Sequence, residues 1–486
     1  MFRKLSISIF FMCISLTALS QDVDSFRAEF EKFRNQAFKT YSDFRDECNS
    51  RYCEFLKSAW EEYDAFKPME SPFKEEDRPP VIYKEEEDEG KRQSVPYAEV
   101  IPPPVPEPRP EPVSPIESRP LEHLTDFAFS FYNTEVKVRL PKERISLDSC
   151  QGEDIAEVWE ILSDDAYDAV ISDCLALRDK LSLCDWAYLQ MIWQLSSMCL
   201  GADSDEAVVM AAYIYSQSGY SMRLAEAEGR LCLLYGSEHK VYRRPYYVLD
   251  GNKYYPYNSD ATHLNVCDFT FENEKGLSLQ VTAEQSFAMS AGEPRHLQAE
   301  RYSTAVDVAV NSNLVEFYNS YPASEINDNF MTGWAIYADA PLDKNIREQV
   351  YPVLNRILEG KTEREAVDIL LDFVQTAFAY EYDEEIWGKE RFFFAEESLY
   401  YPYCDCEDRS ILFSRLVRDL LFLDVVLVYY PGHLATAVKF NQHVEGDHVD
   451  LDGERFVICD PTYIGAPVGL TMPDMDNGEA TILLLR

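Results

Sequence analysis

Apolar residues recur every eleven positions along residues 24–67. Two columns of this repeat are aromatic in all four blocks: Phe30, Tyr41, Tyr52 and Tyr63 in one, and Phe33, Phe44, Phe55 and Phe66 in the other. Eleven residues span three turns at about 3.67 residues per turn, close to the relaxed helix, so the columns would form one nearly straight stripe. The pattern predicts a long helix over residues 22–67. Its stripe would serve self-association or a protein partner, or pack onto the chain's own domains.

The final third of the chain combines helical and strand periodicity. Apolar residues at three- and four-residue spacing predict helices, and alternating or β-branched runs bounded by Gly, Pro and Asp predict strands. The predicted helices cover residues 343–359 and 362–380, with a third beginning after Asp405, and the predicted strands cover residues 425–429, 433–440 and 455–458. We expect an α+β domain over residues 341–486, in which a helix packs on an antiparallel sheet.

Three further regions precede this domain. Residues 68–120 are rich in proline and acidic residues, which predicts an extended, solvated linker. Residues 121–260 have the pattern of an α/β domain with several helices. Residues 261–340 predict a β-rich connecting domain, because several of their segments alternate or carry β-branched residues. These segments are 262–271, 277–282, 306–310 and 314–318.

The first twenty residues have the features of a cleavable export signal. A basic start at Arg3 and Lys4 is followed by an apolar run and by the small residues Ala18 and Ser20. A membrane anchor is the alternative, but the run is shorter than the roughly 20 apolar residues that a span needs. We therefore expect an exported chain, periplasmic or secreted, with no membrane span after cleavage.

The net charge of the chain disfavours some classes of binding partner. A formal net charge of −41 repels phosphate backbones and anionic lipid surfaces, which disfavours nucleic acid and membrane-surface partners. The cysteines show no paired CxxC spacing of a zinc site, so we expect no metal and no cofactor. Eleven of the 12 cysteines lie beyond the signal, and this odd number predicts at least one thiol that is free or paired between chains.

A cysteine, a histidine and an aspartate occupy positions suited to thiol chemistry. Cys406 would lie in the first helical turn, where the helix dipole and a neighbouring imidazolium both lower the pKa of a thiol. His433 opens one predicted strand and Asp460 follows another, and adjacent antiparallel strands can bring the two side by side. Cys404 is the rival thiol, but it precedes the helix.

The segments DCEDR, GHLATAV and ICDPTY, in this order, resemble the Cys, His and Asp boxes of bacterial transglutaminase-like proteins of the papain type. The resemblance covers roughly residues 341 to 486. It makes Cys406 the nucleophile, His433 the general base and acid, and Asp460 the group that orients the imidazole. For the oxyanion hole we consider the Cys406 backbone N–H, with Gln375 or Trp387 as side-chain candidates.

Two functions follow from this resemblance. The first is an exported cysteine enzyme that transfers the acyl group of a protein or peptide amide through a thioester, to water or to an amine. The second is a non-catalytic envelope protein that keeps the fold for binding or scaffolding. The three boxes together favour the enzyme, whereas the aromatic repeat favours a contact role.

An internal echo appears in the first half of the chain. DSDE at residues 203–206 matches DCED at 405–408, and LDG at 249–251 matches LDG at 451–453, both at an offset of 202. This offset aligns Ser204 with Cys406, Leu231 with His433 and Asn258 with Asp460. Residues 121–260 are therefore predicted to be a degenerate copy without the catalytic residues, the alternative being an unrelated α/β domain.

Overall fold

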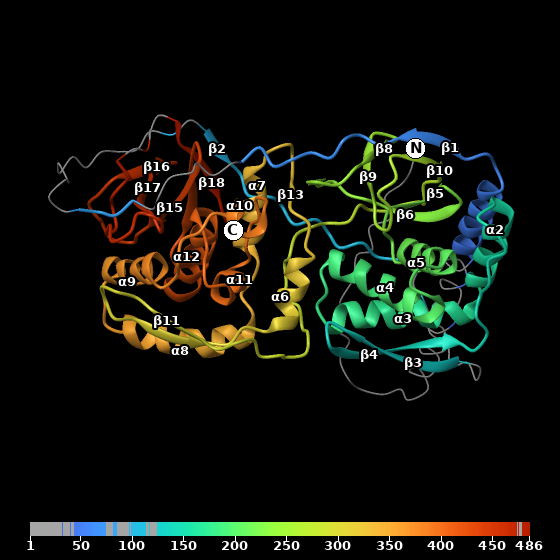
Figure 1. Cartoon of the computed structure of the whole chain (residues 1–486), viewed down its shortest axis with the longest axis horizontal. Coiled ribbons are helices and arrows are strands. Elements are labelled where there is room, and N and C mark those ends of the chain that lie inside the picture. Colours follow the sequence, from blue (N-terminus) through green and yellow to red (C-terminus); the bar gives the residue numbers. More distant parts are fainter. Residues whose placement is uncertain are drawn as a thin grey trace, which may run out of the picture.

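The computed structural model has two lobes that lie side by side (Figure 1). The structure describes residues 43–73, 81–84, 97, 99–112, 116, 124–473, 475 and 479–486, with Lys32 and Lys39. The predicted export signal lies outside these residues. Both lobes mix helices with sheets, which confirms the α+β class. Within this described part of the chain, no helix is long and apolar enough to cross a membrane.

The C-terminal lobe is built on a six-stranded sheet with the order β16-β17-β15-β14-β18-β2. Neighbouring strands are antiparallel, except that β18 and β2 are parallel. The strands are β16 (His448–Leu451), β17 (Glu454–Cys459), β15 (His433–Lys439), β14 (Val425–Tyr430), β18 (Thr481–Leu484) and β2 (Glu99–Ile101). A turn at Pro431-Gly432 joins β14 to β15, and Gly432 has a φ of 76°, which glycine adopts without strain.

Helices cover this sheet and carry the predicted periodicity. The two helices predicted near residues 343–359 and 362–380 are confirmed as α8 and α9, where Asp343 caps the first and a Thr362–Glu365 capping box starts the second. One face of α12 is buried through its leucines and packs against α9 in one apolar cluster. The helices are α6 (Ser312–Asn319), α7 (Met331–Asp339), α8 (Lys344–Leu358), α9 (Glu363–Thr376), α10 (Asp383–Trp387), α11 (Ala395–Tyr400) and α12 (Cys406–Leu421).

The N-terminal lobe has its own six-stranded sheet, with the order β1-β10-β5-β6-β9-β8. Its strands are β1 (Glu61–Asp64), β10 (His263–Cys267), β5 (Met222–Ala227), β6 (Arg230–Gly236), β9 (Asn252–Pro256) and β8 (Tyr247–Leu249). Its helices are α2 (Gly152–Leu162), α3 (Asp165–Lys180), α4 (Asp185–Leu200) and α5 (Asp205–Gln217). Short antiparallel pairs complete the molecule: β3 (Leu124–Phe131) with β4 (Thr134–Pro141), β11 (Arg295–Gln298) with β12 (Ala305–Val308), and β7 (Lys240–Val241) with β13 (Ser324–Glu325).

The two large sheets share one strand order. Reading the N-terminal sheet from β8 and the C-terminal sheet from β16 matches β8-β9-β6-β5-β10-β1 with β16-β17-β15-β14-β18-β2. In each lobe a helix precedes the central hairpin, α5 before β5–β6 and α12 before β14–β15. The edge differs, because β1 is antiparallel to β10 whereas β2 is parallel to β18. This order supports the interpretation of the first lobe as a copy, which stays a prediction.

The prediction of one helix over residues 22–67 is wrong in its C-terminal part. The helix that includes residues 43–56 ends at Leu56, and β1 then pairs with β10, while Phe66 bridges to Tyr246. The aromatic stripe packs onto the chain's own lobe: the Tyr52 ring lies 4.5 Å from that of Trp159. Aromatic residues occur readily in strands as well as in helices, and here pairing with β10 makes the segment of β1 a strand. The repeat before residue 43 lies largely outside the described residues.

The described parts of the predicted solvated linker, residues 68–120, belong to the folded body. Phe73 is buried and packs edge-on against Trp334 of the C-terminal lobe, and β2 extends the sheet of that lobe. The chain then returns to the N-terminal lobe, where Arg178 Nη1 donates to the Pro110 carbonyl over 3.0 Å. This segment therefore connects both lobes instead of spacing a helix away from them.

The predicted β-rich connecting domain over residues 261–340 is also wrong. β10 completes the N-terminal sheet, the β11–β12 hairpin lies on the C-terminal lobe beside α8, and the remainder includes the helices α6 and α7. The segment 314–318 is helical because Asn311 caps α6 by accepting the Asn313 N–H over 3.2 Å. A short apolar run cannot be assigned to strand or helix by periodicity alone.

Candidate functional site

Cys406 is the first residue of α12, as the sequence predicts. Asp405 is the N-cap and accepts the backbone N–H of Asp408 at 3.5 Å. A side-chain acceptor at this position starts a helix by satisfying an otherwise unpaired N–H. The buried leucine face of α12 holds the helix against the lobe, so the thiol lies at the N-terminal, positive end of the helix dipole.

The pairing of β15 with β17 brings His433 and Asp460 together. His433 Nε2 lies 2.9 Å from Asp460 Oδ2, and both side chains are buried. The other carboxylate oxygen, Oδ1, accepts the backbone N–H groups of Thr462 at 2.9 Å and Tyr463 at 3.2 Å. Asp460 thus fixes the imidazole orientation and directs Nδ1 of His433 away from itself, which is the arrangement that a histidine base requires.

A buried hydrogen bond places the first turns of α12 against the end of the β14–β15 hairpin that carries His433. Ser410, one turn after Cys406, donates its hydroxyl to the Leu434 carbonyl over 2.9 Å. Leu434 follows His433 directly in β15. The first turns of α12 therefore lie at the hairpin end where His433 begins.

The sulfur of Cys406 is fully buried and contacts a carboxylate. Cys406 Sγ donates to Glu407 Oε2 over 3.1 Å, and Cys406 and Glu407 are both 0% exposed. An ionised carboxylate at this distance favours the neutral thiol, so thiolate formation requires Glu407 to be protonated or to turn away. Sequence reasoning missed this contact, although Glu407 is the next residue.

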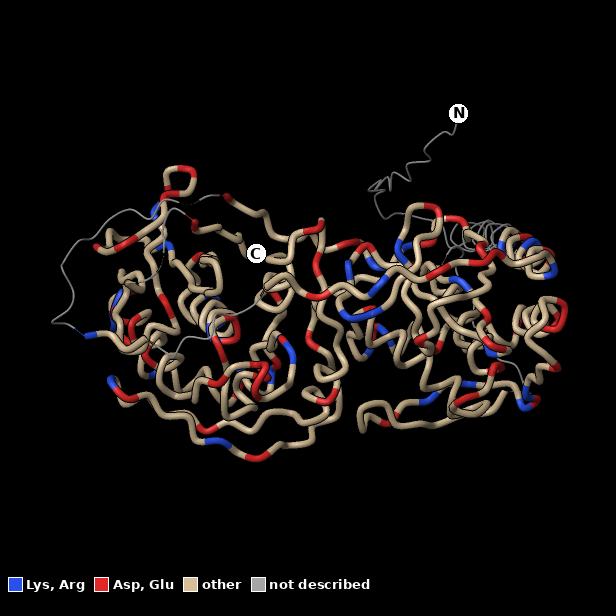
Figure 2. Tube along the Cα trace, turned by 45° about the horizontal axis from the view of Figure 1, so that its top comes forward, with Lys and Arg blue, Asp and Glu red and all other residues tan. Residues whose placement is uncertain are grey.

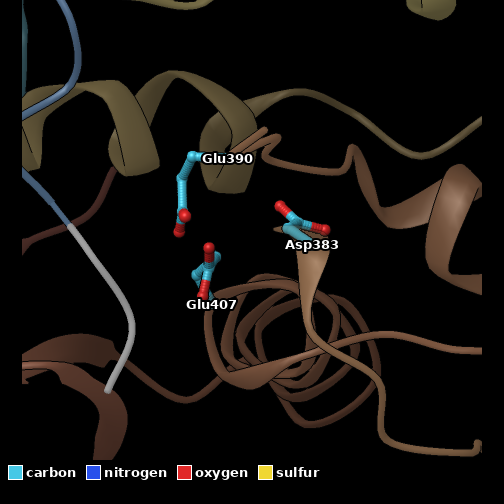
Figure 3. A group of neighbouring side chains, drawn as sticks. All are labelled: Asp383, Glu390 and Glu407. Atoms are coloured by element: carbon cyan, nitrogen blue, oxygen red, sulfur yellow. The ribbon is translucent and has the colours of Figure 1, made fainter. Parts of the chain in front are cut away.

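Buried acids surround the start of α12. In Figure 3 the carboxylates of Glu390 and Glu407 point toward each other, with Asp383 beside them, and one oxygen of each lies within 4.8 Å of the others. Asp383 belongs to a second group of the same spacing with Asp405 and Asp408. In each group the carboxylate oxygens are close enough to hold one hard cation. The sequence prediction considered only zinc sites built from cysteines, so it did not include these acids.

Burial also shifts the titration of acids nearby. Burial raises the pKa of Asp408 well above its ordinary value, while its Oδ1 accepts the Phe393 N–H at 2.8 Å. Burial raises the pKa of Glu397 to about 7, although Arg391 opposes that shift, and it raises the pKa of Glu396 to about 8. Asp408 and Glu396 therefore hold a proton near neutral pH more readily than exposed acids do.

Gln375 is not placed to be an oxyanion donor. The two hydrogens of its Nε2 are shared among three backbone carbonyls, those of Asp460 at 3.0 Å, Tyr463 at 2.8 Å and Ala466 at 3.1 Å. Its Oε1 accepts the Gly465 N–H over 3.1 Å. The prediction of Gln375 as an oxyanion group is therefore wrong, because a buried amide with both ends occupied holds the loop after Asp460 instead.

Trp387 closes α10 and packs in an aromatic cluster. The guanidinium of Arg391 lies 4.1 Å from its ring centroid, and Tyr401 packs edge-on at 5.1 Å. The indole Nε1 is buried and has no hydrogen-bond acceptor among the residues that the structure describes. Trp387 as an oxyanion donor stays a prediction.

Cys404 lies before α12, as expected, but it is buried and chemically different from Cys406. Its exposed fraction is 2%, and burial raises the pKa of Cys404 to about 11. Such a thiol is largely protonated near neutral pH and is a poor nucleophile. The eleven cysteines that the structure describes are all free thiols, from Cys48 to Cys459.

The N-terminal lobe places other residues where the C-terminal lobe has its cysteine and histidine. The helix α5 has Ser204 as its N-cap and begins with Asp205, as α12 begins with Cys406. The strand β6 begins with Arg230, which pairs with Ala227 across the hairpin as His433 pairs with Tyr430. The constant offset of 202 is therefore wrong for these two positions: Asp205 and Arg230, not Ser204 and Leu231, occupy them.

These two first-lobe residues contact each other. Arg230 Nε lies 3.2 Å from both carboxylate oxygens of Asp205. Asn258, at the position predicted opposite Asp460, also contacts β6, because its Oδ1 accepts the Leu233 N–H over 2.9 Å. An ion pair thus joins the helix start to the strand start, the same two positions that Cys406 and His433 occupy in the second lobe.

Comparisons of the chain with protein-family models, curated proteins and solved structures found no match.

Proposed function

We propose that the chain is an exported, transglutaminase-like cysteine enzyme that acts on amide bonds of a protein or peptide. The contact that carries this proposal is the 2.9 Å hydrogen bond between His433 Nε2 and Asp460 Oδ2, at the hairpin end where Cys406 begins α12. A carboxylate that fixes one ring nitrogen of a histidine prepares the other nitrogen for proton transfer. The three sequence boxes support the same assignment.

In this proposal Cys406 is the nucleophile. His433 accepts the thiol proton, the sulfur attacks the carbonyl carbon of the amide, and a C–S bond forms. The C–N bond then breaks, and the departing amine takes the proton from His433. Water or a second amine attacks the thioester and restores the thiol, which gives hydrolysis or transamidation. Backbone amides at the start of α12, with the Cys406 N–H among the candidates, would stabilise the oxyanion.

The second candidate is a non-catalytic binding or scaffolding protein that keeps the fold. It is favoured by one specific observation, the fully buried Cys406 sulfur that donates to Glu407. An enzyme must expose this sulfur and release this contact before a substrate can react. A scaffold would need neither step.

The two candidate functions predict different results in an acyl-transfer assay. The chain without its first twenty residues would be incubated with a mixture of unfolded proteins and a fluorescent primary amine, and both amine incorporation and new peptide termini would be measured by mass spectrometry. The enzyme predicts one of these products, its loss in Cys406→Ala, and its retention in the matched control Cys404→Ala. Equal product from Cys406→Ala, or none from the unaltered chain, would favour the scaffold.

A further inference from the structure

A cavity of about 540 Å³ lies between the two lobes. The N-terminal lobe contributes Trp186 and the segment Tyr242–Arg244, and the C-terminal lobe contributes the segments Tyr318–Ala323 and Lys389–Phe392. The volume is in the range of about 300 to 1,000 Å³ that is typical of pockets for small organic molecules. Aromatic rings form much of its wall.

The cavity is cationic in a strongly acidic chain. Its lining holds four cationic side chains, Arg243, Arg244, Lys389 and Arg391, and one carboxylate, that of Glu390. The formal net charge of the whole chain is −41, and acidic residues are spread over both lobes (Figure 2). A cavity lined by one sign of charge concentrates ligands of the opposite sign.

Two of these cations are already paired. Arg391 forms an ion pair with the buried Glu397, and Arg243 Nε lies 2.8 Å from Glu70 Oε2. The carboxylate of Glu390 points toward that of Glu407, and it is the one acid among the lining residues (Figure 3). The cavity therefore keeps positive charge that internal pairing does not cancel.

Arg244 and Lys389 have no carboxylate partner among the described residues. The Arg244 guanidinium lies 5.5 Å from the ring centroid of Trp186, and its one hydrogen bond to the chain is a long one, 3.5 Å to the Pro256 carbonyl. The Nε1 of Trp186 is buried, and no acceptor among the described residues receives its hydrogen. Trp186 itself is 2% exposed. An indole N–H can only donate, and this one adds to the two cationic side chains of the cavity lining.

We propose that this cavity binds an organic anion, whose acid group accepts hydrogen bonds from Arg244, Lys389 and Trp186 and whose ring packs on the aromatic walls. A buried N–H without an acceptor costs free energy, and a ligand acceptor removes that cost. The aromatic rings add apolar contact with a planar or sugar ring. An acidic peptide and a sugar acid share this chemistry. The inference does not depend on thiol chemistry at Cys406.

The test is calorimetric titration of the full chain with matched acid and neutral probes. The probes are the dipeptide Glu-Tyr with a blocked N-terminus and amidated C-terminus, its Gln-Tyr counterpart, digalacturonic acid and its methyl ester. The proposal predicts binding of at least one acid and at least tenfold weaker binding of its neutral counterpart, because a hydrogen bond to a charged group is worth about that factor. The acid that binds identifies the source, peptide or sugar.

Variants locate the site. Arg244→Gln, Lys389→Gln and Trp186→Phe should each weaken binding of the acid about tenfold, whereas Arg356→Gln, an exposed arginine on α8, should not change it. Melting temperatures check folding, and Arg244→Lys, which keeps the charge, should recover part of the affinity. Cys406→Ala should bind normally, which separates this site from the proposed enzyme activity. Equal affinity for acid and neutral probes, no binding at millimolar concentration, or unchanged affinity in the first three variants would overturn the proposal.

Discussion

Gln375→Met tests whether this amide holds the loop that follows the candidate aspartate. Methionine has a similar size but leaves three carbonyls and the Gly465 N–H without the hydrogen bonds that Gln375 makes, the four bonds spanning 2.8 to 3.1 Å. At about 1 kcal/mol for each lost bond, and more where a buried group stays unpaired, the free energy of unfolding should fall by roughly 3 to 6 kcal/mol. For a lobe of this size the melting temperature should fall by roughly 10 °C.

Urea denaturation measures this loss, with Gln442→Met as the matched control because Gln442 is exposed. The same variant should also slow reaction of the Cys406 thiol, since a displaced loop no longer holds Asp460 against His433. A loss within about 1 kcal/mol of the control would refute the assigned role, and the Gln375 amide would again be a candidate for the oxyanion hole.

Three further predictions test the fold and the pH dependence. Burial raises the pKa of Glu396 from 4.5 to about 8, so the contribution of Glu396 to stability is full below pH 4.5 and is lost as the pH rises toward 8. Glu396→Gln should therefore reduce the fall in the free energy of unfolding between pH 5 and pH 8.5, measured with urea, and an unchanged slope would contradict this. Tyr52→Ala should lower the free energy of unfolding by about 3 to 5 kcal/mol because Tyr52 is 1% exposed, whereas Phe55→Ala should cost less than half as much because Phe55 is 37% exposed. Equal losses in calorimetry would contradict packing of the aromatic stripe on its own lobe. Arg230→Ala should leave acyl transfer unchanged, since the first lobe lacks the cysteine and histidine, and loss of activity with a normal melting temperature would place that lobe in the active site.

Local pattern was sufficient where short-range rules decide structure. The starts of α9 and α12 follow from capping residues, and the β14–β15 hairpin follows from a Pro-Gly turn between two apolar runs. The same rules placed Cys406 at a helix start and His433 at a strand start. Both positions depend on residues within a few places in the sequence.

Long-range contacts could not be derived in this way. The Gln375 amide finds acceptors 85 to 91 residues later in the chain, and nothing near it in the sequence indicates them. Tyr63 pairs with Leu264 in a strand although its repeat has a helical period, because backbone pairing across the sheet outweighed the local pattern. The shared strand order of the two lobes also emerges only in three dimensions, since their helix starts, hairpins and turns follow different offsets.

Thiol labelling would identify the nucleophile of this chain and the base that activates it. The mature chain would be treated with iodoacetamide from pH 5 to pH 9, and the rate of modification of each cysteine would be measured by mass spectrometry. We predict that Cys406 reacts fastest near neutral pH, that His433→Ala slows it by tenfold or more, and that His443→Ala, which removes an exposed histidine, leaves it unchanged. Labelling of Cys404 in preference to Cys406, or equal rates at Cys406 with and without His433, would contradict the assignment of the nucleophile and its base.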